Sequence, residues 1–178
     1  VTLGKIRSIM VNVMGEVEVP GTYRLSAFAS VFHALYRAGG VNRIGSLRTI
    51  QVVRNGEKVA DVDVYKYIME GKLADDIRLS EGDVILVSPY ENLVGISGKV
   101  KRPMIYEMKQ GESLAALINY AGGFTGDAYR NTLRLLRRSG REKQIYNVDK
   151  VDYENFILTD DDEVSVEAVL DRFSNKVE

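Results

Sequence analysis

Alternating apolar and polar side chains mark the first strand of the chain. Ile9, Val11 and Val13 are separated by more polar residues, which is the two-residue period of a strand with one buried face. Residues 15–21 form a turn region that ends in a Pro-Gly pair, which suits a tight turn. A second strand through residues 23–25 would complete a hairpin.

Apolar residues then change to helical spacing, at Val31, Ala34, Leu35 and Ala38. This spacing predicts an amphipathic helix with one face toward a core. Ser30 is the natural N-cap residue, with Ser26 as an earlier alternative. Gly39 and Gly40 follow the last apolar position, and glycine favours the left-handed conformation that ends a helix.

Beyond the helix, β-branched residues return around a polar turn. Thr49–Arg54 and Val59–Val64 flank the pair Asn55-Gly56, the dipeptide most typical of two-residue hairpin turns. A short helical or irregular piece over Val64–Met69 and a closing strand over Val84–Val87 complete the pattern. Strands that carry one helix across one sheet predict an α+β arrangement of the β-grasp kind.

The whole pattern occurs twice. A shift of 83 residues gives eleven identities over positions 11–54 without a gap; they include Gly15/Gly98, Pro20/Pro103, Tyr23/Tyr106, Ala38/Ala121, Gly39/Gly122, Gly40/Gly123 and Arg54/Arg137. Such self-similarity indicates two copies of one unit. We therefore expect two tandem β-grasp-like modules, at 1–90 and 91–170, and a tail at 171–178 that leads into a further module.

Composition narrows the chemistry that these modules can perform. The net charge is −1, which gives no electrostatic reason to expect a nucleic acid partner. The chain has no cysteine, so it can form no disulfide and perform no thiol catalysis. It has a single histidine, His33, so the residues that usually bind metal ions are scarce. The sequence predicts a protein that is not an enzyme, with no cofactor, no metal ion and no catalytic residue.

Paired glycines leave two alternatives open. They are helix caps, which the capping geometry favours, or positions where a ligand approaches the backbone. On the second interpretation, the candidate ligand-binding residues are Gly39, Gly40, Asn42, Gly122, Gly123, Phe124 and Thr125. The matched tyrosines, Tyr23 and Tyr106, are expected to pack on a strand rather than to stack on sugar rings.

The clustered charges also have two interpretations, a solvated surface or a binding site. A basic hairpin carries Arg134, Arg137, Arg138, Arg141 and Lys143. We expect a solvated edge that its charges protect from strand pairing, although Arg137 and Arg138 remain candidates for contact with an anionic polysaccharide. The acidic run 160–163 is expected to be a solvated turn rather than a calcium site, because residues 80–83 fill the same turn in the first copy.

A family resemblance follows from these motifs. Each copy resembles the SLBB (soluble ligand-binding β-grasp) module. In the first copy the motifs that carry the resemblance are 11–17, Pro20-Gly21-Thr22-Tyr23 and Ala38-Gly39-Gly40. The second copy repeats them as Gly98-Lys99-Val100, Pro103, Tyr106 and Ala121-Gly122-Gly123-Phe124. Tandem modules of this kind are similar to those of polysaccharide export proteins in Bacteroides-type bacteria.

The resemblance implies a function, a location and partners. The function would be capsule or exopolysaccharide export, by modules that serve oligomeric assembly and contact glycan. The location would be the periplasm, in association with the outer membrane, with the signal and anchor outside this fragment. The partners would be polysaccharide, copies of the same protein in a ring, and the inner-membrane synthesis and export machinery.

The principal alternative is a stand-alone module that binds a soluble glycan or another small molecule. A concave apolar pocket with a few converging polar groups would support it. DNA uptake is a third class, because related modules occur in competence proteins, but the nearly neutral charge disfavours it.

Overall fold

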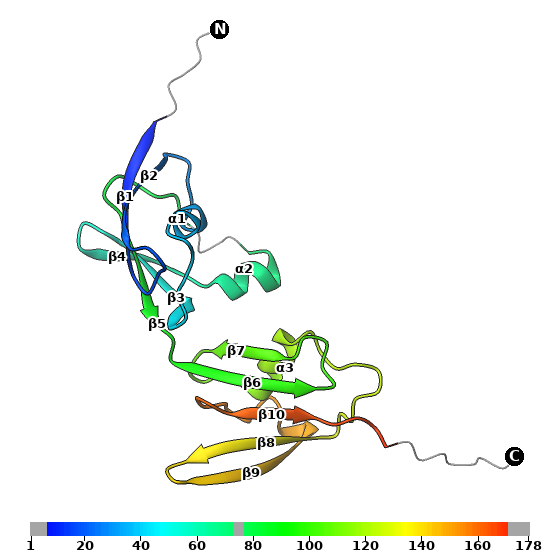
Figure 1. Ribbon diagram of the computed structural model, residues 1–178. Coiled ribbons are helices and arrows are strands. Elements are labelled where there is room, and N and C mark those ends of the chain that lie inside the picture. Colours follow the sequence, from blue (N-terminus) through cyan, green and yellow to red (C-terminus); the bar gives the residue numbers. More distant parts are fainter. Residues whose placement is uncertain (1–6, 73–76, 171–178) are drawn as a thin grey trace, which may run out of the picture. The chain divides into compact units, whose positions relative to one another are not determined.

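Two compact units make up the chain, and the division between them falls after Tyr90. The computed structural model describes residues 7–72 and 77–170 (Figure 1). The tail at 171–178, predicted to lead into a further module, lies outside the described residues. Within the described ranges, no helix is both long enough and apolar enough to span a membrane.

Among the described residues 7–72 and 77–90, the first unit has five strands and two short helices in chain order. They are β1 (Ser8–Gly15), β2 (Gly21–Ser26), α1 (Val31–Arg37), β3 (Gly45–Arg54), β4 (Glu57–Val62), α2 (Val64–Glu70) and β5 (Val84–Pro89). The strands form one sheet in the order β2-β1-β5-β3-β4. Central strands β1 and β5 are parallel, whereas the other neighbours are antiparallel.

The second unit repeats this arrangement. Its elements are β6 (Asn92–Gly98), β7 (Met104–Met108), α3 (Leu114–Tyr120), β8 (Thr132–Ser139), β9 (Glu142–Asp149), the 3₁₀ turn η1 (Lys150–Asp152) and β10 (Glu163–Val166). The sheet order is β7-β6-β10-β8-β9, with β6 and β10 parallel. The α+β fold with two tandem β-grasp-like modules, expected from the sequence, is therefore confirmed.

Element boundaries differ from the prediction in several places; among them, β5 ends at Pro89 rather than Val87 and β4 begins at Glu57 rather than Val59. Strand β3 begins at Gly45 rather than Thr49, and β4 ends at Val62 rather than Val64. The side chain of Asp63 accepts a hydrogen bond of 3.0 Å from the backbone N–H of Tyr65 and caps α2. The strand therefore stops where a helix cap begins, and Val64 belongs to the helix.

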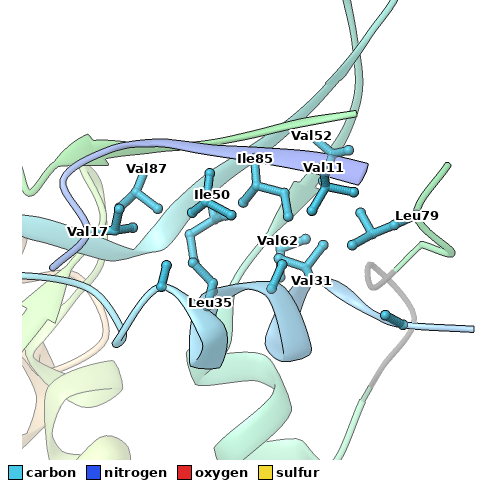
Figure 2. Packing of buried hydrophobic residues seen from close by; sticks show 14 of the residues in the cluster. Val11, Val17, Val31, Leu35, Ile50, Val52, Val62, Leu79, Ile85 and Val87 are labelled. Atoms are coloured by element: carbon cyan, nitrogen blue, oxygen red, sulfur yellow. The ribbon is translucent and has the colours of Figure 1, made fainter. Parts of the chain in front are cut away.

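A hydrophobic core lies between helix and sheet in the first unit. Val31 and Leu35 of α1 point toward Val11, Ile50 and Ile85 on the strands (Figure 2). These side chains are buried, which explains the alternation in the strands and the helical spacing in α1.

The core of the second unit is built in the same way from matched positions. Leu114 and Leu117 of α3 are fully buried, as are Leu133 and Leu135 of β8. Each unit thus has a core of its own.

One glycine in each unit lies where two parallel strands meet. Gly15, with φ of 85°, pairs with Val87, and a Cβ built on Gly15 would lie 2.2 Å from the Val87 carbonyl oxygen. Gly98, with φ of 88°, would place a Cβ 2.1 Å from the Val166 carbonyl oxygen. Both positions therefore require glycine, for backbone conformation and for space.

Candidate functional site

The paired glycines close the main helix of each unit. Gly40 N–H donates to the Leu35 carbonyl at 2.8 Å, and Gly39 N–H donates to the Tyr36 carbonyl at 3.1 Å. These two bonds form a Schellman motif, in which left-handed residues satisfy the last helix carbonyls. Gly122 and Gly123 repeat the pattern after α3, with hydrogen bonds of 3.0 and 2.9 Å.

The hairpin loop of the same unit is bonded to this helix end. Glu18 N–H donates to the Gly40 carbonyl at 3.0 Å, and Val19 N–H donates to the Ala38 carbonyl at 2.9 Å. In the second unit, Lys101 and Arg102 bond to the carbonyls of Gly123 and Ala121. We call this junction of hairpin loop and helix end the seam. Its hydrogen bonds use backbone groups of the glycines for which helix capping was favoured and ligand approach was left as the alternative.

Asn42, Phe124 and Thr125 extend the seam. Asn42 donates from Nδ2 to the Glu16 carboxylate at 2.9 Å and accepts from Ile44 N–H at 3.0 Å. Thr125 Oγ1 donates to the Asp127 carboxylate at 2.7 Å, and Phe124 forms a β-bridge with Val100. The structure therefore brings the candidates of each unit together, as parts of a structural junction.

Arg137 has a different environment from the one predicted. Its guanidinium binds Asp162 through two hydrogen bonds of 3.0 and 2.8 Å and also donates to the Ile157 carbonyl at 3.0 Å. The Asp162 side chain is fully buried. The prediction of a fully solvated basic edge is therefore wrong for Arg137, and that of a solvated acidic turn is wrong for Asp162.

Arg138 remains at the surface, 3.2 Å from the Asp161 carboxylate. Asp161 adopts a positive φ of 66° at the turn position that Gly82 occupies in the first unit with φ of 79°. Aspartate tolerates this conformation better than most residues. The ion pairs of Arg137 and Arg138 reduce the positive charge that the hairpin can offer to an anionic glycan.

Arg54 and Asp83 form the same bidentate pair in the first unit. The two hydrogen bonds measure 2.9 and 2.8 Å, and Ser80 N–H donates to the same carboxylate at 2.8 Å. Burial alone would raise the pKa of Asp83, but the hydrogen bonds from Arg54 and Ser80, together with the Arg54 charge, lower it below its ordinary value. We call the two pairs, Arg54–Asp83 and Arg137–Asp162, the clamps.

The matched tyrosines have structural roles too. Tyr106 is 3% exposed, and its hydroxyl donates to the Arg102 carbonyl at 2.7 Å. The Tyr23 hydroxyl donates in the same way to the Val19 carbonyl. A buried ring with a bonded hydroxyl cannot stack on a sugar, so the packing role is the one that the geometry supports at Tyr106.

A groove that sequence reasoning missed lies between β2 and α1 of the first unit. Its volume is about 530 Å³, and it is lined by Arg24, Leu25, Ser26, Phe28, Ala29, Phe32, His33, Tyr36 and Arg37. We call this surface the aromatic groove. Phe28 is 74% exposed and Tyr36 85% exposed, which is unusual for large aromatic side chains.

Cations surround the aromatic groove. Arg24 and Arg37 line it, and neither is paired with a carboxylate among residues 7–72 and 77–170. The Arg78 guanidinium lies 4.6 Å from the centroid of the Phe28 ring, and its Nε donates to the Ala27 carbonyl at 3.0 Å. Exposed ring faces beside guanidinium groups form a surface that can bind both an apolar face and an anion.

His33 is the N3 residue of the capping box at the start of α1, and it also lines the groove. Its Nδ1 accepts a hydrogen bond of 3.1 Å from Ser30 N–H. This hydrogen bond gives His33 a local role at the start of α1. In the described part of the chain, no cluster of three or more His, Cys, Asp or Glu residues is arranged to hold a metal ion.

The fold defines the class of protein. Each unit is a mixed five-stranded sheet with a central parallel pair and one main helix across a face, which is a β-grasp domain. Family models described as "SLBB domain" match residues 10–87 and 93–147. The chain therefore belongs to the SLBB domain family, with one domain in each unit, as the sequence predicted.

Similar proteins come from Escherichia coli. Two curated proteins, both named "Polysialic acid transport protein KpsD", are 26% identical to this chain over 145 residues. The matched region covers 80% of this chain but 25% of each relative. The chain thus spans about a quarter of the length of these relatives.

Proposed function

We propose that the two SLBB domains are non-catalytic modules of a polysaccharide export protein of the Gram-negative envelope. They would face the periplasm, assemble with copies of the same protein and contact the capsular polysaccharide or exopolysaccharide in transit. One observation carries this proposal: a similarity of 26% identity over 145 residues to a protein named for polysialic acid transport. The matched region covers 80% of the chain, so it is longer than either unit alone.

Edge strand β7 supports the assembly part of the proposal. Its exposed positions are apolar, with Met104 55% and Ile105 65% exposed, and both line a shallow pocket of about 400 Å³. By contrast, edge strand β4 carries Lys58 and Asp61, whose charges discourage strand pairing. A neighbouring copy docked on β7 would form the heterologous interface from which closed rings are built.

Gene deletion and complementation would test both parts. Deleting the gene should abolish surface polysaccharide, and the wild-type gene should restore it, whereas a gene encoding Ile105→Lys should not. Ile145→Lys on β9 is the matched control, because Ile145 is 62% exposed and receives the same charge on another strand.

The outcomes separate the two parts. Unchanged polysaccharide after deletion would exclude the export role. Full restoration by Ile105→Lys would reject β7 as the assembly surface and leave the export role standing.

A second candidate function is binding of a soluble glycan or small molecule by a domain that acts alone. The aromatic groove favours it, because its volume of about 530 Å³ lies within the usual range of ligand pockets, roughly 300–1,000 Å³. On this alternative, binding would persist in solution while deletion of the gene would leave surface polysaccharide unchanged.

A further inference from the structure

We infer that the aromatic groove binds a carboxylated sugar polymer, with Phe28 and Tyr36 against the sugar rings and Arg24 and Arg37 on the carboxylates. This inference deepens the proposed function, on which it rests for the choice of a glycan. It assigns the glycan contact to one surface of the first unit and gives the ligand its chemical class.

Comparison of the two units shows that the fold does not require the groove residues. With the 83-residue shift, Phe28 corresponds to Gly111 and Tyr36 to Asn119. The second unit therefore forms the same sheet and the same helix without either aromatic side chain. Two large aromatic residues exposed to water, at positions where the fold accepts glycine and asparagine, indicate a binding role.

The charges of the groove are also particular to the first unit. Arg24 corresponds to Glu107, and Arg37 corresponds to Tyr120. A guanidinium presents parallel N–H groups that match the two oxygens of a carboxylate, so unpaired arginines favour an anionic ligand with planar acid groups. This contrasts with Arg54 and Arg137, whose guanidinium groups already bind buried aspartates.

Stacking explains why the ligand would be a sugar. One face of a pyranose ring presents C–H groups, which pack on the flat face of an aromatic side chain while the hydroxyl groups remain in water. Tyr36 and Arg37 are adjacent on α1, and Arg24 lies across the groove on β2. A ring on Tyr36 would therefore have cations on both sides, which suits a polymer that repeats its carboxylate along the chain.

Isothermal titration of the 178-residue chain with three polymers would test the inference. Polygalacturonate carries carboxylates, dextran is neutral, and dextran sulfate carries sulfates. We expect saturable binding of polygalacturonate, no binding of dextran and weaker binding of dextran sulfate. Spectra of ¹⁵N-labelled protein should change at residues 24–37 and not at the aligned residues 107–120.

Two variants and two matched controls locate the site. Tyr36→Asn introduces the residue that the second unit has at the aligned position, and Arg37→Gln removes one charge; each should weaken polygalacturonate binding about tenfold. Asn119→Ala and Arg141→Gln, both at exposed positions outside the groove, should leave the affinity within about twofold. The ¹⁵N spectra of the variants check that the fold is kept.

Several results would overturn the inference. Equal loss with Arg141→Gln and Arg37→Gln would indicate diffuse attraction to the basic hairpin. Dextran binding as tightly as polygalacturonate would exclude carboxylate recognition. A change of oligomeric state with Tyr36→Asn, without loss of glycan binding, would make the groove a protein interface. If no polymer bound but gene deletion still abolished surface polysaccharide, the groove assignment would fail and the export role would stand.

Discussion

Arg54 and Arg137 illustrate how single residues hold each SLBB domain together. Each clamp joins the third strand of its unit to the turn before the last strand, over 29 residues in the first unit and 25 in the second. Asp83 and Asp162 are fully buried as side chains, so each carboxylate depends on its arginine for compensation of the lost hydration.

Asp83→Asn should lower the stability of the first unit by about 2–3 kcal/mol at pH 7, because two charge-assisted hydrogen bonds lose their anion. The lowered pKa of Asp83 contributes stability above the unfolded pKa of about 4, and this contribution is lost as pH falls through the folded pKa. Acid should therefore destabilise the wild type more than the variant below about pH 4.

Urea unfolding between pH 2 and 7 would measure both effects. Asp61→Asn is the control, since the Lys58–Asp61 pair is more than half exposed at each side chain and should contribute less than about 1 kcal/mol. Equal losses for the two variants would contradict a structural role for the clamp.

At the scale of elements, the sequence was sufficient for most of the fold. The alternation at Val11 and Val13 and the spacing of Val31 and Leu35 identify strand and helix, because one side of each faces a core. The end of β4 was missed because Val62 and Val64 continue the apolar pattern, while the cap of Asp63 is a hydrogen bond that no periodicity reveals.

The aromatic groove could not be predicted from either element alone. No sequence pattern marks Arg24 on β2 or Tyr36 on α1, and only the tertiary structure brings them to one surface. The clamps, by contrast, had a signal in the repeat, because Arg54 matches Arg137 at the 83-residue shift and Asp83 matches Asp162 at a shift of 79. Conversely, the groove lies where the copies differ, as at Phe28 and Gly111.

Strands β1 and β5 approach each other closely at Gly15, and this predicts a large cost for any side chain there. Gly15→Ala should destabilise the first unit by about 3 kcal/mol, since it adds a backbone clash with Val87 to the strain of a positive φ. Gly56→Ala is the matched control, with φ of 79° and no atom within 4 Å of the added Cβ. It should cost only about 1 kcal/mol.

Thermal and urea unfolding of both variants would measure the difference. Gly98→Ala and Gly140→Ala repeat the comparison in the second unit, because Gly140 also has a positive φ and open space around it. Similar costs within each pair would show that strain alone, without the clash, determines the glycine requirement.

At the scale of the whole chain, the important feature is that each unit has its own core, clamp and seam. Buried leucines and valines of the first unit pack around α1, and those of the second around α3. A unit of about 90 residues can bury enough apolar surface to fold alone, although with modest stability.

We therefore expect residues 1–90 and 91–178 to fold as separate proteins. Each should give a dispersed ¹⁵N spectrum and a cooperative urea transition with a free energy of unfolding of roughly 3–6 kcal/mol. The spectrum of each should reproduce the corresponding core signals of the full chain. An unfolded spectrum from either piece would mean that its core needs the rest of the chain.

The segment between the fourth and fifth strands differs between the two units. It contains α2 in the first unit and only the 3₁₀ turn η1 in the second, while the seam has the same hydrogen bonds in both. The two copies therefore differ at this connection and agree at the seam. We therefore expect this connection, rather than the seam, to accept a grafted tag or a new binding loop without loss of the fold.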